Sequence, residues 1–168
     1  MELELLYDII NKYEKQFLES KGDCSDKIWF IKKNKIQEEL DIQISEQELG
    51  IFFGAGLRAC RLKCSHMILA VESILRKFEN KEDVLYALEN FDTERPSVYP
   101  ESMREHFLGF LVLDNKEQTV RFLVHDIIKN PAGELEFKDE MRTLGTEMGF
   151  GMIDIIIKMY IDGFKFKK

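Results

Sequence analysis

The longest periodic pattern in the sequence runs from Leu49 to Phe78, and it constrains the fold more than any other feature. Its apolar positions recur at steps of one, three or four residues: Leu49, Phe52, Phe53, Gly56, Leu57, Cys60, Cys64, Met67, Ile68, Val71, Ile74, Leu75 and Phe78. Such steps place side chains on one face of an α-helix. A capping box at Ser45–Glu48 precedes the pattern. The sequence therefore predicts a helix over residues 46–79.

A second, thinner apolar stripe follows the opposite side of this predicted helix, at Ile51, Ala55, Leu62 and Leu69. A helix that is apolar on two sides is typical of the middle of a bundle. As one straight rod it would be about 50 Å long, whereas a compact domain of this size has a radius of gyration of about 15 Å. We therefore expect a bend or break near Gly54–Gly56 or near Ser65.

Gly54, Gly56 and Ala59 match the glycine pattern of a dinucleotide-binding loop. That loop requires a strand before the glycines and a second, parallel strand ending in an acidic residue. Residues 66–78 repeat at helical spacing instead, and Glu72 lies inside them. We interpret Gly56, with the cysteines one and two turns later, as a ridge of small side chains against a neighbouring helix. The sequence predicts no cofactor.

Helical spacing also dominates the remainder of the chain. It predicts helices over residues 3–17, 27–40, 80–91, 102–111, 120–128 and 137–161, with turns at 20–25, 93–100, 114–118 and 130–133. Residues 41–45 fit one short extended stretch, but no partner strand is evident nearby. A chain of 168 residues is most simply one domain. The predicted fold is thus all-α: one domain over residues 1–168, a bundle of seven or eight helices around a long, kinked, buried central helix.

The excess of acidic residues argues against some classes of binding partner. The net charge is −7, and both halves of the chain are acidic. Nucleic acids and anionic membranes require a positive face, so we expect neither as a partner. Residues 35–50 imitate a helix-turn-helix spacing, but their second helix would begin with Ser45-Glu46-Gln47-Glu48, which repels phosphates. The negative charge either keeps the protein soluble or complements a basic protein surface.

The N-terminal residues and the cysteine content predict a cytosolic protein. The first residues carry several acids and Lys12, unlike a signal peptide, and no apolar run approaches the ~20 residues of a membrane span. The three cysteines are an odd number without a C-x-x-C pair, which is typical of reduced thiols.

No catalytic or metal-binding constellation is evident. Cys60 and Cys64 share a helix face in the prediction, but His66 points elsewhere and a structural zinc site needs four converging ligands. We interpret the cysteines as small buried hydrophobes. His125 has Arg121 and Lys129 one turn away on either side, which predicts a solvated cationic strip. A histidine that meets a serine or cysteine through the fold is left open.

Five residues are candidate contacts for a ligand or partner. Arg58 and Arg61 lie one turn apart and could bind an anion or pair with acids of a neighbouring helix, and His66 follows them. Arg95 and Tyr99 lie in a proline-bounded loop and belong to types enriched at interfaces. We expect a non-enzymatic, cytosolic protein that binds another protein or a second copy of itself, as a regulator, inhibitor or immunity-type factor. The alternative is a sensor or enzyme with a small-molecule pocket inside the bundle.

Overall fold

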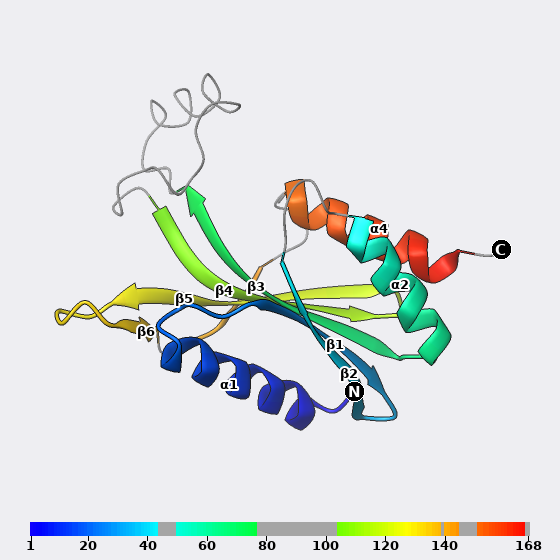
Figure 1. The fold of residues 1–168 in the computed structure, drawn as a ribbon, viewed down its shortest axis with the longest axis horizontal. Coiled ribbons are helices and arrows are strands. Elements are labelled where there is room, and N and C mark those ends of the chain that lie inside the picture. Colours follow the sequence, from blue (N-terminus) through cyan, green and yellow to red (C-terminus); the bar gives the residue numbers. More distant parts are fainter. Residues whose placement is uncertain (44–49, 77–103, 139, 145–150, 167–168) are drawn as a thin grey trace, which may run out of the picture.

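The computed structural model describes residues 1–43, 50–76, 104–138, 140–144 and 151–166, and it is built on a seven-stranded antiparallel sheet (Figure 1). The prediction of an all-α bundle of seven or eight helices was therefore wrong. The described helices are α1 (Leu3–Glu19), α2 (Gly50–Leu62) and α4 (Gly151–Lys165). The strands are β1 (Asp26–Lys32), β2 (Lys35–Ile42), β3 (His66–Arg76), β4 (Arg104–Asp114), β5 (Thr119–Lys129), β6 (Leu135–Phe137) and β7 (Arg142–Leu144).

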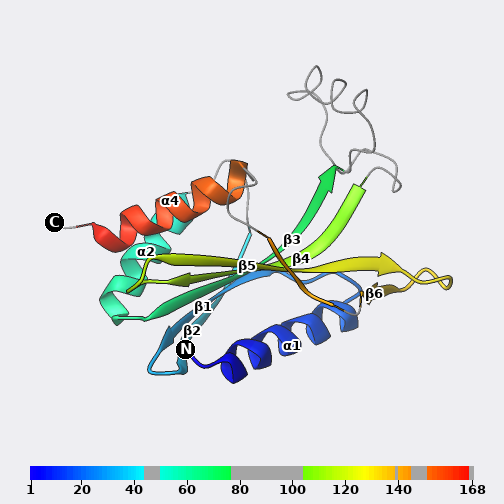
Figure 2. The ribbon, with the colours of Figure 1, turned by 180° about the vertical axis from the view of Figure 1, so that it is seen from behind.

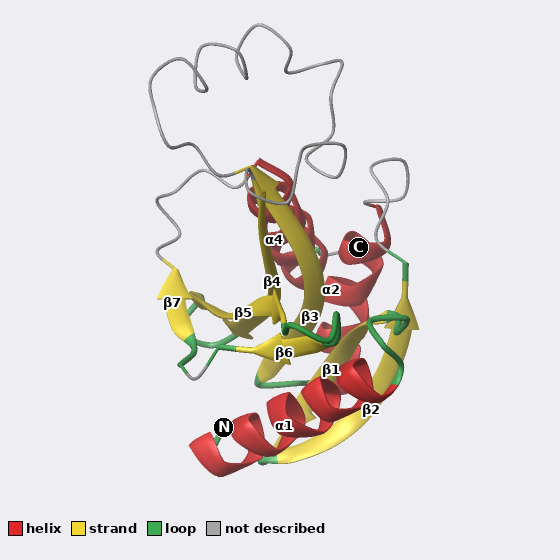
Figure 3. Cartoon of the chain, turned by 90° about the vertical axis from the view of Figure 1, so that its left-hand side faces the viewer, coloured by secondary structure: helices red, strands yellow, loops and turns green. Residues whose placement is uncertain are grey.

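The sheet separates two helical layers. Its strand order is β2-β1-β3-β4-β5, and β6 and β7 pair with successive parts of the far side of β5. Helix α1 covers one face, and α2 and α4 cover the other (Figures 1 and 2). Viewed along the molecule, β2 and β7 lie at opposite borders of the sheet (Figure 3). Two separate hydrophobic cores result, one on each face.

The central strands explain the error in the predicted fold. Met67 and Leu69 of β3 point into the core beneath α2 and α4, whereas Ile68 and Ala70 point into the core against α1. A strand covered on both faces is apolar at every position, so its period of two disappears. Such a run also contains residues at steps of one, three and four, and it cannot be distinguished from a buried helix by periodicity alone.

The predicted helix over residues 46–79 combines two different elements. Helix α2 ends at Leu62, Lys63 adopts a positive φ of 55°, and strand β3 begins at His66. The predicted break near Ser65 is thus confirmed, but the chain continues as a strand. Gly54 and Gly56 lie inside α2, away from any turn between a strand and a helix. This position agrees with the prediction that they do not form a dinucleotide loop.

Residues 27–40 form a hairpin instead of the predicted helix. Lys33 and Asn34 have φ values of 50° and 58°, as a two-residue type I′ turn requires at both central positions. Of the extended stretch predicted over residues 41–45, Asp41 and Ile42 end β2 and pair with β1, whereas residues 44–45 lie outside the described ranges. Residues 104–114 and 119–129 are likewise strands, joined by the predicted turn at 114–118.

Several local predictions are confirmed. The opening helix is present and buries the predicted apolar positions Leu6, Ile10, Tyr13 and Phe17, although Leu3 is exposed. It stops where Gly22, with φ 83°, donates its N–H to the carbonyl of Phe17. The prediction of a helix over residues 137–161 is confirmed only from residue 151, in α4, where Ile155 is exposed; it was wrong at Phe137, which ends β6, and at residues 142–144, which form β7. The helix predicted over residues 80–91 and the loop at 93–100 lie outside the described residues.

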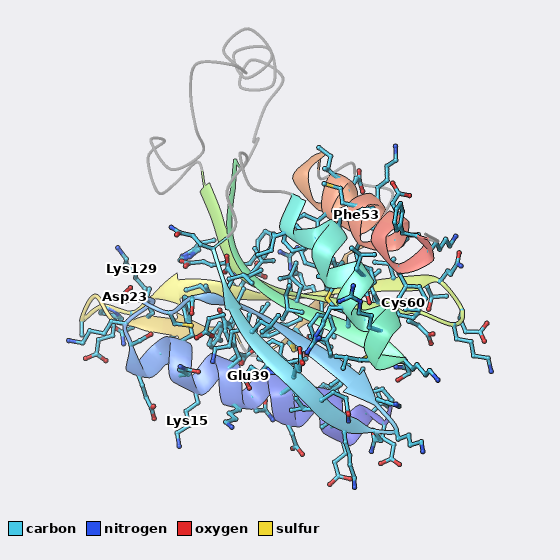
Figure 4. The ribbon with its side chains drawn as sticks, turned by 45° about the vertical axis from the view of Figure 1, so that its right-hand side comes forward. Lys15, Asp23, Glu39, Phe53, Cys60 and Lys129 are labelled. Carbon is cyan, nitrogen blue, oxygen red and sulfur yellow. The ribbon has the colours of Figure 1, made fainter. Side chains whose placement is uncertain are left out.

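Of the predicted ridge of small residues, Gly56 contacts a neighbouring helix as expected, whereas Cys60 is exposed and Cys64 lies beyond the end of α2. A Cβ on Gly56 would lie 2.6 Å from the backbone nitrogen of Phe164 in α4, and one on Gly163 would lie 2.9 Å from the carbonyl carbon of Phe53 in α2. Both clashes involve backbone atoms, so the two helices touch because neither position has a side chain. Phe53 lies at this junction (Figure 4).

Candidate functional site

Of the predicted contact residues, Arg58 forms a bridge between α2 and the sheet. Its guanidinium donates to both carboxylate oxygens of Glu38 on β2, from Nε to Oε2 at 3.0 Å and from the terminal nitrogen to Oε1. The expected pairing with an acid is confirmed, but the acid lies on a strand and not on a helix. Arg61 is exposed on the same helix, and no ion pair among the described residues involves it. Arg95 and Tyr99 lie outside the described residues.

His66 lies in a cavity of about 130 Å³ between the start of α1 and the ends of β3, β4 and β5. Its Nε2 is 3.3 Å from Oδ2 of Asp114, and Arg121 and Thr119 also line the cavity. Burial lowers the pKa of His66, although the carboxylate of Asp114 acts in the opposite direction. The structure thus places His66 beside the carboxylate of Asp114 and in the same cavity as Arg121, both distant in sequence. It does not bring Arg58 or Arg61 to this cavity.

Ser65 completes a serine–histidine–aspartate row, with its Oγ 2.9 Å from Nδ1 of His66. A nucleophilic serine must direct its proton to the base. The hydroxyl of Ser65 instead donates to the carbonyl of Ile31 at 3.2 Å, and the backbone N–H of Ser65 donates to the same carbonyl. Ser65 therefore ties the start of β3 to the end of β1, which is a structural role.

A second cavity, of about 110 Å³, forms a groove between α1 and the β1–β2 hairpin. Leu5 and Ile9 of α1 form one wall, and Trp29 and Ile36 form the other. Trp29 is buried and meets Tyr13 edge-on at a ring distance of 5.7 Å, so the floor of the groove is rigidly packed. The groove opens beside β2.

Lys27 of β1 and Glu39 of β2 line this groove. Nζ of Lys27 is 2.7 Å from Oε1 of Glu39 and 3.4 Å from Oδ1 of Asp41. Hydrogen bonding to Glu39 raises the pKa of Lys27, and the same bond lowers the pKa of Glu39. Figure 4 shows Glu39 on β2, facing α1. One cation is therefore shared by two carboxylates.

The outer side of β2 has no partner strand among the described residues, where the sheet ends. Ile36 and Leu40 are 43% and 41% exposed on this strand. They lie on opposite faces, because Ile36 pairs with Ile31 of the α1-side core and Leu40 pairs with Ile28 of the other core. The ladder is regular from Asp26 to Phe30 of β1 and shifts register after it. Strand β2 is thus an open edge with an exposed apolar side chain on each face, Leu40 within its regular part and Ile36 beyond the register shift.

Two further histidine–carboxylate pairs escaped the sequence analysis. His125 reaches Oε1 of Glu14 on α1 at 2.9 Å and stacks on Phe137, so the predicted solvated cationic strip around His125 was wrong. Burial raises the pKa of Glu14, and His125 opposes that shift. His106 reaches Oε1 of Glu72 across β3 and β4 at 2.6 Å. Both pairs join residues that are far apart in the sequence, so no local residue spacing could have predicted them.

The cysteines are free, and the interpretation of them as buried hydrophobes holds in part. Cys64 is buried, Cys24 is half-buried and Cys60 is exposed. Within the described ranges, no group of three or more histidine, cysteine or acidic side chains could hold a metal ion.

Comparisons with known proteins add no identity. No protein-family model, no curated protein and no solved structure matches this chain. In the part of the chain that the structure describes, no helix combines the length and apolar character required to cross a membrane.

Proposed function

We propose that this chain is a non-enzymatic protein that works by binding another protein, and that it does so by strand addition at the outer edge of β2. The observation that carries the proposal is the open edge itself, which ends the sheet among the described residues and bears exposed apolar side chains on both faces. In strand addition, main-chain hydrogen bonds give affinity, and pockets for alternate side chains give specificity.

The groove beside β2 supports this mode of binding. Alternate side chains of an added strand point toward the α1 face of the sheet, where Trp29 and Ile36 line a cavity of about 110 Å³. The remaining side chains point toward the other face, where Leu40 is exposed. Each face of the edge thus offers an apolar contact to an incoming strand.

Small-molecule binding, the alternative function, has less support. Ligand pockets usually enclose about 300–1,000 Å³, whereas the cavities at His66 and beside Trp29 enclose about 130 and 110 Å³. Each has room for a single side chain or a few water molecules. The hydroxyl of Ser65 beside His66 donates to the backbone of β1, which does not favour a nucleophilic role.

We also propose that the protein acts in the cytosol. Its three cysteines are free in the structure, which fits a reducing compartment. Binding of a cytosolic partner at the edge of β2 requires neither a disulfide nor a metal ion.

A pair of matched leucine variants tests the proposed function. A partner is first trapped by photo-crosslinking from β2 and then purified. Leu40→Lys places a charge in the apolar contact and should weaken binding of that partner by about tenfold or more. Leu18→Lys, at an α1 side chain that is 38% exposed compared with 41% for Leu40, should leave binding within about twofold.

Amide hydrogen exchange supplies the second readout for the same complex. Strand addition should slow exchange of alternate β2 amides on binding, because those N–H groups gain main-chain acceptors. Equal loss of affinity in both leucine variants, with unchanged exchange across β2, would contradict the proposal.

A further inference from the structure

The charges around β2 indicate which kind of strand this edge accepts. Resting on the proposed function, we infer that the bound segment is a cationic, extended stretch of a different protein, with a lysine or arginine facing Glu39 and Asp41. It carries an aliphatic residue on the same face that enters the groove beside Trp29.

The α1 side of the edge has an excess of negative charge. Glu39 and Asp41 share Lys27, whose side chain is only 12% exposed, whereas the side chain of Asp41 is 67% exposed. Asp8 and Lys12 of α1 line the same groove and balance each other. On the opposite face, Glu38 is already paired with Arg58. One carboxylate charge on the α1 side is thus left for a cation supplied from outside.

The two carboxylates and the groove lie on the same face of β2. Glu39 pairs with Trp29 in the ladder, and Ile36 pairs with Ile31, and both partners belong to the core against α1. Side chains at even spacing on an added strand share one face. A single segment can therefore place a basic residue at Glu39 and Asp41 and an aliphatic residue at Ile36.

A second copy of this chain does not fit the same edge. Two copies related by a twofold axis would pair their β2 strands antiparallel. In every register whose axis passes between Glu38 and Leu40, a carboxylate of one copy lies directly opposite a carboxylate of the other. Because residues directly opposite each other share a face of the sheet, Glu38 faces itself, Glu39 faces itself, or Glu39 faces Asp41, depending on the register. Like charges directly opposite each other destabilise strand pairing, so the edge favours a partner of opposite charge.

Charge also gives the partner strand a direction. Lys35 lies at one end of β2, and Glu38, Glu39 and Asp41 lie toward the other. A segment with basic residues toward one end therefore aligns them with the acidic end of β2 and keeps them away from Lys35. Complementary charge fixes register and orientation more than it adds affinity.

Two synthetic peptides test this inference. One is an eight-residue peptide that carries, on one face, a valine opposite Ile36 and lysines opposite Glu39 and Asp41, with valine throughout the other face, and the other peptide carries glutamate in place of lysine. The chain has a single tryptophan, and Trp29 lines the groove, so its fluorescence reports binding. We expect the lysine peptide to bind about tenfold more tightly than the glutamate peptide.

Paired charge variants distinguish binding at β2 from attraction to the acidic protein as a whole. Glu39→Gln with Asp41→Asn should weaken the lysine peptide about fivefold or more. Glu117→Gln with Glu134→Gln removes the same charge from exposed positions elsewhere and should leave binding within about twofold. Urea unfolding verifies that each variant is folded.

The outcomes separate this inference from the proposed function. Equal weakening by both charge pairs, or equal binding of the two peptides, would overturn the inference of a cationic segment. If a trapped partner still loses affinity in the Leu40→Lys variant, strand addition stands and only the charge preference fails. If the lysine peptide does not bind at all, the inference is also overturned, and the leucine variants decide the proposed function.

Discussion

Gly56 shows how one position can hold two elements together through the absence of a side chain. A Cβ on Gly56 would lie 2.6 Å from the nitrogen of Phe164 and 3.0 Å from the carbonyl carbon of Gly163. Gly54, two residues earlier on the same helix, has no heavy atom within 4 Å of its own added Cβ. The sequence predicted a close helix contact at Gly56. It could not identify α4 as the partner, because nothing in the local pattern refers to the C-terminal helix.

Alanine at the two glycines should have opposite effects. Gly56→Ala forces the backbones of α2 and α4 apart and should lower the free energy of unfolding by about 1–3 kcal/mol. Gly54→Ala adds an alanine to an open helix position and should raise it by about 0.5–1 kcal/mol. Urea unfolding measures both changes. Equal stability of the two variants would show that the helices do not touch at Gly56.

His66 makes the stability of the fold depend on pH. Burial lowers its pKa below the usual 6.5, so the unfolded chain takes up this proton at a higher pH than the folded chain. Stability attributable to His66 is therefore fully present above pH 6.5 and is lost as the pH falls through the lowered pKa. In the His66→Gln variant, the free energy of unfolding should decline less between pH 7.5 and pH 5. The two proteins are compared by urea unfolding at each pH, and parallel curves would contradict the assignment.

At the scale of elements, the sequence identified helix α1, which has one solvent-exposed face, and failed on the central strands, which have none. Helix α1 has a buried apolar face and an exposed charged face, so the period of 3.6 residues is recognisable in its sequence. In β4, residues 107–113 are all buried, and the period of two that marks a strand is absent. The turns at Gly22 and at 114–118 could be predicted, because glycine, asparagine and aspartate favour turn conformations through their own backbone and side-chain properties.

In the candidate site, too, single residues could be recognised from the sequence, whereas features of the assembled sheet could not. From the sequence, Arg58 was recognisable as a candidate for pairing with a carboxylate, and His66 as a candidate contact residue. The edge of β2 was not recognisable, because an edge is a property of the assembled sheet. Likewise, Glu14 and His125 meet at 2.9 Å although 111 residues separate them. Interactions of this kind become visible only when the strand order is known.

For the whole molecule, the placement of charge matters more than its total. A net charge of −7 keeps copies apart at long range, but salt screens that repulsion within about 10 Å at 0.1 M ionic strength. Carboxylates lying opposite each other act at contact distance and are less screened. We therefore expect the sign of charge at β2, and not the net charge, to decide whether two copies pair through this edge.

Exchanging the charges at this edge tests that expectation. The triple variant Lys27→Glu, Glu39→Lys, Asp41→Lys reverses the internal ion pairs and changes the net charge from −7 to −5. Alone, it should remain monomeric, because like charges still lie opposite each other in a twofold pair. Mixed with the unmodified chain, it should form a heterodimer, since opposite charges then face across the two β2 edges.

The matched control for this mixture carries Glu117→Gln and Glu134→Gln, which also gives a net charge of −5 but leaves β2 unchanged. Mixed with the unmodified chain, it should stay monomeric in sedimentation velocity and light scattering. If the charge-exchanged variant behaves like this control, β2 is closed to pairing for a reason other than charge. Dimers in both mixtures would instead show that net charge alone holds the copies apart, because only one mixture places opposite charges at the edge.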